Sequence, residues 1–202
     1  MVIAIFVIGL FIGMMIETIN SNKINNFYMS SEINLVDGLA ISQIAGESLD
    51  CESLKAYNIE FADKIYQEAK LLEQYEEAGK LTNNLKLLHR RYDLLRTLAW
   101  MSNTNSLKEC GNYNLIVYLY EYDTEDLTKK ATQEVWSKIL LDVKSSDENI
   151  VLIPIAVDQD ITSLNLLLEN YDITQYPAVI VNNKDVINNL ETPEDLTNLI
   201  NN

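Results

Sequence analysis

The chain of 202 residues has few of the residues that build phosphate, metal or hydrolase sites. Its six glycines form neither a G-x-x-x-x-G-K nor a G-x-G-x-x-G pattern, so loops that cradle nucleotide phosphates are absent. His89 is the only histidine and has no neighbouring cysteine, whereas zinc needs several such ligands. No G-x-S-x-G elbow occurs. We therefore predict no cofactor, no metal site and no recognisable catalytic motif.

Basic residues are also scarce. Lys and Arg number 15 against 30 Asp and Glu, a formal net charge of −15. From Gly111 to the end there are 16 acidic and 5 basic residues. Because phosphate and anionic lipid are bound by clustered Lys and Arg, this composition argues against nucleic acid and against docking on lipid surfaces. The acid favours either a basic partner or simple solubility.

The N-terminal segment is apolar. Residues 1–16 carry no charged side chain, and only Glu17 interrupts the apolar run to Ile19. A membrane span needs about 20 apolar residues, with about 17 tolerated, and no small-residue cleavage site follows. We predict a transmembrane signal anchor over residues 1–19; a cleaved signal peptide and a buried core helix are the alternatives. Lys23 alone cannot set the orientation.

Helical periodicity fills the middle of the chain, residues 28–110. After a moderate helical pattern at 30–45, Asp50 is a candidate N-cap. Apolar residues three or four apart follow it and return after a break at 76–80: Leu54, Tyr57, Phe61, Ile65, Ala69 and Leu72, then Leu81, Leu85, Leu88, Tyr92, Leu95 and Ala99. A short break between two long amphipathic helices makes them antiparallel, so we predict a hairpin over residues 51–102.

The two cysteines flank this hairpin. Cys51 begins the first arm and Cys110 lies just beyond the second, so an antiparallel arrangement would bring the thiols together. We predict a disulfide between them and, with it, an extracytoplasmic location for the part outside the membrane. The alternative is two unpaired cysteines in a cytosolic protein.

The last ninety residues predict an α/β domain. Residues 115–120 (LIVYLY) have strand composition. Asp123 then predicts the N-cap of a helix, and residues 150–157 (IVLIPIAV) predict a strand buried on both faces. The apolar stripe expected on that helix is Leu127, Ala131, Val135, Ile139 and Val143.

The remaining elements follow at close spacing. A short helix is expected from Thr162 or Ser163 to Tyr171, then a strand at 178–181 and a turn at 182–185 that leads to a short strand. Thr192-Pro193-Glu194-Asp195 is a helix start with Thr as N-cap and Pro at the first position. The predicted order is βαβ–α–β-hairpin–α.

This order, and the segment 171–181 (YDITQYPAVIV), resemble the thioredoxin family, in which a Y-x-I/V-x-x-x-P segment precedes a central strand. The resemblance covers residues 112–202 and not the hairpin. It implies a cis peptide bond between Tyr176 and Pro177, with the proline facing the active site.

The sequence departs from that family where thioredoxins carry Cys-x-x-Cys: residues 122–127 contain no cysteine. Thiol–disulfide exchange needs a thiolate, so dithiol chemistry at this site is excluded. The resemblance implies a binding site formed by Tyr122, Asp123, Thr124, Glu125, Asp126, Tyr176 and Pro177. Its acids would suit a cation or a basic peptide, or would simply cap the helix. We interpret Asp158-Gln159-Asp160, a lone D-x-D, as turn and cap residues.

We therefore predict a membrane-anchored, redox-inactive thioredoxin-like protein that binds a protein or peptide or has a structural role. The alternative is an envelope thiol–disulfide oxidoreductase that uses Cys51 and Cys110, although their separation of 59 positions argues against it. A third possibility is a subunit of a larger membrane complex.

Overall fold

The computed structural model describes residues 50–77, 85–111, 113–190 and 192–200. Before Asp50 it describes residues 6–16, 18–19, 26, 29–30, 32–33, 36–37 and 40, all of them helical. The chain divides into two compact units, Met1–Asp37 and Gly38–Asn202. The helix expected over residues 30–45 therefore falls largely outside the described residues.

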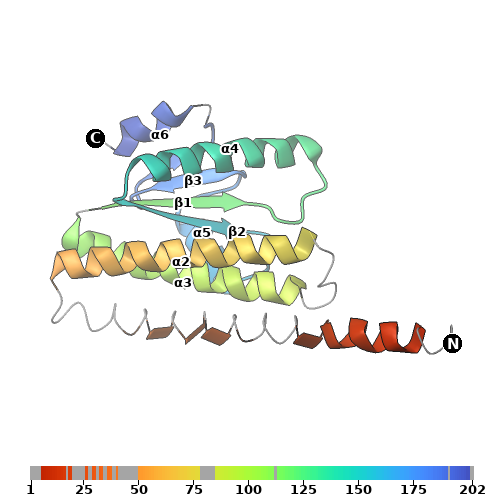
Figure 1. The fold of residues 1–202 in the computed structure, drawn as a ribbon. Coiled ribbons are helices and arrows are strands. Elements are labelled where there is room, and N and C mark those ends of the chain that lie inside the picture. Colours follow the sequence, from red (N-terminus) through yellow and green to blue (C-terminus); the bar gives the residue numbers. More distant parts are fainter. Residues whose placement is uncertain are drawn as a thin grey trace. The chain divides into compact units, whose positions relative to one another are not determined.

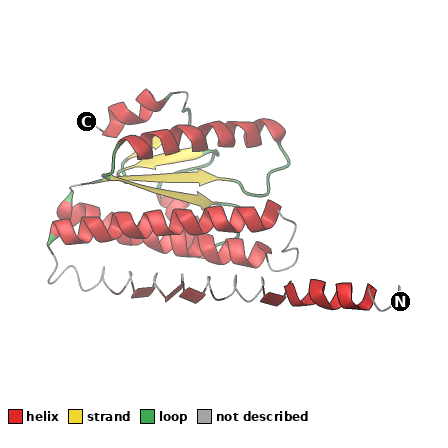
Figure 2. Ribbon diagram, in the orientation of Figure 1, coloured by secondary structure: helices red, strands yellow, loops and turns green. Residues whose placement is uncertain are grey.

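In the first unit, residues 6–16 form one helix (Figure 2). At 1.5 Å per residue the described stretch 6–16 spans roughly 16 Å, about half of the ~30 Å hydrocarbon core of a bilayer. Nowhere in the described residues is a helix both long and apolar enough to cross a membrane. The predicted transmembrane signal anchor over residues 1–19 is therefore wrong. The single-pass membrane localisation with an extracytoplasmic soluble part, which was inferred partly from it, is wrong as well.

The second unit begins with two long helices, α2 (Cys51–Glu77) and α3 (Leu85–Cys110), which run antiparallel (Figure 1). The Asp50 carboxylate caps α2 by accepting hydrogen bonds from the main-chain N–H and the hydroxyl of Ser53, which lower its pKa. The predicted hairpin is confirmed, and its second arm extends to Cys110. There Gly111, at a φ of 60°, ends the helix by donating its N–H to the carbonyl of Leu107.

A four-stranded sheet follows, in the order β2-β1-β3-β4. The strands are β1 (Asn114–Tyr120), β2 (Ile150–Ala156), β3 (Ala178–Val181) and β4 (Asp185–Ile187). β1 and β2 pair in parallel, while β3 pairs antiparallel with both β1 and β4. The helices between and after them are α4 (Leu127–Ser146), α5 (Thr162–Asn170) and α6 (Pro193–Ile200). This is the element order that the sequence predicted.

Helices cover both faces of the sheet. α4 and α6 lie on one face, and the α2–α3 hairpin and α5 lie on the other (Figure 1). The α4 side is packed with alternate strand residues, with apolar residues of both helices and with Leu190 from the segment before α6. These residues are Ile116, Tyr118, Trp136, Ile139, Leu140, Val143, Ile150, Val179, Val181, Leu190 and Leu196. Burial on both faces explains why β1, β2 and β3 read as continuous apolar runs rather than as alternating ones.

The start and the buried face of α4 differ from the prediction. The N-cap is Asp126, not Asp123: the Asp126 carboxylate accepts the N–H groups of Thr128 and Lys129 at 2.8 and 3.1 Å. Leu127 is 81% exposed and Val135 52%. The predicted stripe advanced only in steps of four residues, and each such step turns about 40° beyond a full helical turn. Over four steps the stripe rotates by about 160°, so it cannot stay on one face.

The β3–β4 turn ties the sheet to the hairpin. Asn182 and Asn183 both have positive φ, at 50° and 57°, and Lys184 closes the turn by donating its N–H to the carbonyl of Val181 at 3.0 Å. The side-chain oxygen of Asn183 accepts hydrogen bonds from the indole N–H of Trp100 at 2.9 Å and the hydroxyl of Thr104 at 3.0 Å. The end of the β-hairpin is thus fixed against α3.

Candidate functional site

Two of the segments predicted to form a site meet at the carboxyl end of β1. In the antiparallel β1–β3 pair, Leu119 lies opposite Ala178, so the next positions outward are Tyr120 and Pro177. The peptide bond between Tyr176 and Pro177 is cis, as predicted. We call residues 121–126 together with Tyr176 and Pro177 the carboxyl-end site.

The loop of this site is held by a carboxylate from the end of β2. Asp158 accepts the main-chain N–H of Tyr122 at 3.0 Å through Oδ1 and that of Asp123 at 2.7 Å through Oδ2. The side-chain amide of the buried Gln159 donates to the same carboxylate at 3.3 Å. Asp158 therefore acts as a turn and cap residue, as interpreted from the sequence. Its role in shaping the site was not foreseen.

The start of the loop is fixed by two residues of α4. The buried side chain of Gln133 accepts the N–H of Glu121 and donates to its carbonyl, both at 2.9 Å. The Nζ of Lys129 lies 2.8 Å from both carboxylate oxygens of Glu121. Main chain and side chain of Glu121 are thus both oriented before any ligand binds.

The predicted acidic residues have different surroundings. Asp126 caps α4, and its own N–H donates to the hydroxyl of Thr124 at 3.4 Å. Asp123 and Glu125 are exposed. Across the part of the chain that the structure describes, no group of three or more His, Cys, Asp or Glu side chains could hold a metal ion. The acidic side chains give the loop a negative charge, and the carboxylate of Asp126 is occupied as the N-cap of α4.

Aromatic side chains border the site. Tyr176 is half-buried; burial raises its pKa, and the nearby charge of Glu121 raises it further, so the phenol stays neutral. The ring of Tyr122 lies against that of His89, with centroids 4.0 Å apart. Arg90 donates to the carbonyl of Asp160 at 2.8 Å. The beginning of α3 therefore borders the site, although nothing in the sequence links residues 89–90 to the loop more than thirty positions later.

A buried charged pair lies behind the ends of β1 and β2. Arg96 and Asp93 are 5% and 1% exposed, and Arg96 Nη1 lies 3.0 Å from Asp93 Oδ1. That oxygen also accepts the N–H of Ala156 at 3.1 Å. Burial raises the pKa of Asp93, against the lowering effects of Arg96 and of the Ala156 N–H. Burial opposes the charge of Arg96, but Tyr120 and Asp93 outweigh it and raise the pKa of Arg96.

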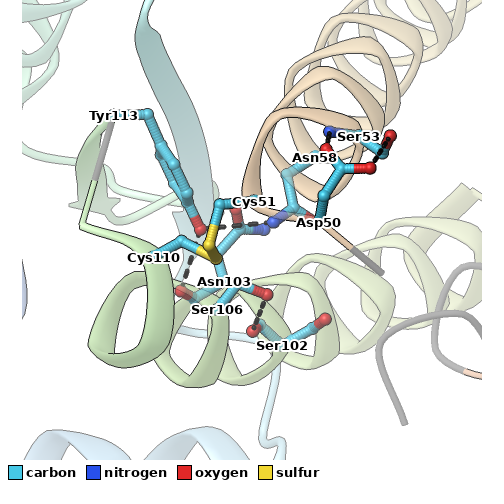
Figure 3. The surroundings of a disulfide bond; sticks show 9 residues. All are labelled: Asp50, Cys51, Ser53, Asn58, Ser102, Asn103, Ser106, Cys110 and Tyr113. Carbon is cyan, nitrogen blue, oxygen red and sulfur yellow. Dashed lines mark hydrogen bonds between the residues drawn. A yellow bond between two sulfur atoms is a disulfide. The ribbon is translucent and has the colours of Figure 1, made fainter. Parts of the chain in front are cut away.

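The disulfide lies at the other end of β1 (Figure 3). Cys51 and Cys110 are bonded, with Cα atoms 5.3 Å apart, so this prediction is confirmed. Beside them the hydroxyl of Tyr113 accepts from Asn58 at 3.2 Å and donates to the carbonyl of Asn103 at 3.1 Å. Burial raises the pKa of Tyr113 to about 12. A strand of this length spans roughly 20 Å, which separates the disulfide from the carboxyl-end site.

Comparisons of the chain with protein-family models, with curated proteins and with solved structures found no match. The carboxyl-end site offers a preorganised loop, exposed carboxylates and a neutral, half-buried phenol, an arrangement suited to binding.

Proposed function

We propose that the protein is a binding module that receives an extended peptide at the carboxyl-end site, in a thioredoxin-like domain that has no dithiol chemistry. In thioredoxins the groove beside the cis-proline takes an extended peptide. The element order from β1 to α6 and the place of Pro177 support the resemblance. Residues 122–127 contain no sulfur, so the site can bind a peptide but cannot exchange a disulfide with it.

The observation that carries the proposal is the β1–β3 register. Paired residues of β3 begin at Ala178, so the main chain of Tyr176 lies just beyond the ladder and beside the end of β1. Main-chain groups next to a sheet end can pair with an extended ligand, because strand addition uses the same hydrogen bonds as the sheet. The side chains of the ligand would pack against Tyr176 and Tyr122.

Preorganisation supports binding at this place. Asp158 and Gln133 fix the loop from both sides, so little conformational entropy remains to be lost when a ligand binds. The exposed carboxylate of Glu125 and the net charge of −15 favour peptides with basic residues. We expect their association to weaken as salt is added.

The test selects peptides from a random display library on the full chain and measures their affinities by fluorescence anisotropy. Tyr176→Ala removes the phenol, and Thr124→Arg places a bulky side chain in the loop. Both should weaken binding at least tenfold, because truncating or blocking a central contact costs on the order of 2 kcal/mol. Val135→Arg is the matched control, an exposed position on α4 outside the site. Selected peptides that bind both site variants as tightly as the wild type would reject the proposal.

The alternative is a thiol–disulfide oxidoreductase that uses Cys51 and Cys110. An insulin-reduction assay on the full chain separates the two functions. The binding module predicts no turnover above background. Turnover that disappears in the Cys51→Ala variant would favour the oxidoreductase.

A further inference from the structure

β2 is an edge strand of the sheet, and the direction of its main-chain groups follows from two hydrogen bonds. Asn114 donates its N–H to the carbonyl of Asn149, and Val157 donates to the carbonyl of Tyr120, both at 2.9 Å. The odd-numbered residues of β2 therefore bond to β1. Because successive residues of a strand point their N–H and C=O groups to opposite sides, four residues direct theirs to the outer edge: Ile150, Leu152, Pro154 and Ala156.

Three of these four positions leave no free donor. The N–H of Ile150 donates to the carbonyl of Asp147 at 3.3 Å. Pro154 has no N–H, and the N–H of Ala156 is bound by Asp93. The N–H of Leu152 finds no partner in the described segments of the chain. An unpaired stretch of edge strand is a template for a further strand.

Leu152 lines a groove between α2 and α4. The groove has a volume of about 580 Å³, within the range of ligand-binding pockets. Ile59, Ala62 and Tyr66 line it from α2, and Leu141 lines it from α4. An ion pair between Lys144 Nζ and Asp63 Oδ1, 3.2 Å apart, joins the two helices across it. The apolar part of the lining is flanked by polar side chains, and the strand edge supplies main-chain groups between the two helices. The polar lining residues are Asp63, Gln67, Lys144, Ser145 and Glu148.

We propose that this groove binds an extended segment of another polypeptide by strand addition to β2 at Leu152. The partner's carbonyl accepts from the N–H of Leu152, and its N–H groups donate to the outward carbonyls on either side of that N–H. An aliphatic side chain of the segment fills the space between Tyr66 and Leu141. Because Pro154 and the bound Ala156 end the available edge, the paired stretch is short, about three residues.

Charge selects the class of partner. Lys144 is already paired with Asp63, whereas Glu148 is exposed at the same groove. A basic residue beside the aliphatic one therefore complements the rim. A second copy of this chain would bring another net charge of −15 to the interface, which opposes self-association. The partner we infer is an aliphatic, β-prone segment flanked by lysine or arginine.

The probe is a hexapeptide with blocked ends and the sequence Thr-Val-Ile-Val-Thr-Lys, titrated into the full chain and followed by amide NMR. Wild-type protein should show saturable binding, with the Leu152 amide shifted and its hydrogen exchange slowed at least tenfold. The same peptide N-methylated at alternate residues, in each of the two registers, keeps its side chains but loses the donors of one strand edge. One of the two methylated peptides should bind at least tenfold more weakly.

Two variants at one position isolate the main-chain contact. Leu152→Pro removes the unpaired N–H without removing a hydrogen bond to β1. The strand already contains a proline at another outward-facing position, Pro154. Leu152→Ala truncates the side chain and keeps the N–H. The proline variant should bind the hexapeptide at least tenfold more weakly than the alanine variant. Leu166→Lys, an exposed position on α5, should bind it like the wild type.

Four results would overturn the proposal. The first is that the hexapeptide fails to bind wild-type protein at millimolar concentration, and the second is that all three peptides bind equally. The third is that the two Leu152 variants bind the hexapeptide equally. The fourth is that, without peptide, the protection of the Leu152 amide from hydrogen exchange rises with protein concentration. The last would assign the edge to a second copy of the chain. The methylated peptides use wild-type protein, so the test does not depend on the folding of Leu152→Pro.

Discussion

Replacing both Cys51 and Cys110 by alanine should lower the stability of the protein by about 4 kcal/mol. The disulfide joins positions 59 residues apart. On the chain-entropy relation a loop of that size restricts the unfolded chain by roughly 14 cal/mol/K, which is about 4 kcal/mol at 25 °C. For a chain of this size each 1 kcal/mol corresponds to roughly 2–4 °C, so the midpoint of thermal unfolding should fall by about 10 °C.

The native contacts around the disulfide explain why most of the effect should come from the unfolded state. Tyr113 is held by Asn58 and Asn103 through hydrogen bonds that do not involve sulfur, so this end of the hairpin keeps its packing without the cross-link. Urea unfolding of the oxidised wild type and of the double variant measures the difference. The slope of the transition should also rise, because the uncrosslinked chain exposes more surface. A loss below about 1 kcal/mol, with the disulfide verified by mass spectrometry, would refute this reasoning.

Two further predictions concern buried polar groups. Asp93→Ala leaves the guanidinium of Arg96 buried without its carboxylate, so urea unfolding at pH 7 should show a loss of about 3–5 kcal/mol; a loss under about 1 kcal/mol would mean that water reaches Arg96. Tyr113 keeps its proton up to about pH 12 in the folded state, against about 10 when unfolded. The raised pKa therefore stabilises the folded protein fully below pH 10. As the pH rises from 10 to 12, the free energy of unfolding should fall by about 3 kcal/mol because the unfolded state ionises first. The Tyr113→Phe variant should lack that part of the alkaline decline, and identical declines would contradict the raised pKa.

Local signals in the sequence predicted several parts of the structure well. Runs of β-branched residues located β1 and β2, and the Asn182–Asn183 pair marked a turn whose backbone few other residues adopt. The disulfide was predictable because an antiparallel hairpin returns its ends to one place. Each of these inferences needs only neighbouring residues or one simple geometric rule. The apolar N-terminal run met the composition of a membrane span, but among the described residues no helix is both long and apolar enough to cross a membrane.

The N-cap of α4 was missed because three acids offer the same signal. Asp123, Glu125 and Asp126 all precede the helix, and acids are favoured at such positions. The choice is made by a distant residue: Asp158 accepts the N–H groups of Tyr122 and Asp123, which holds a turn there and delays the helix to Leu127. No pattern within the loop contains that information. The contributions of His89 and Arg90 are hidden for the same reason.

Several acidic residues counted in the net charge serve the fold rather than the binding of a partner. Asp93, Asp126 and Asp158 each accept main-chain N–H groups, at the end of β2, the start of α4 and the loop after β1. These carboxylates complete the hydrogen bonding of strand and helix ends, so they are committed to the fold. Electrostatic selection of a partner therefore depends on the exposed acids near each proposed site, Glu125 at one and Glu148 at the other. Because exposed charges are screened within about 8 Å at physiological salt, the two sites should select basic residues independently, each through its own nearest carboxylate.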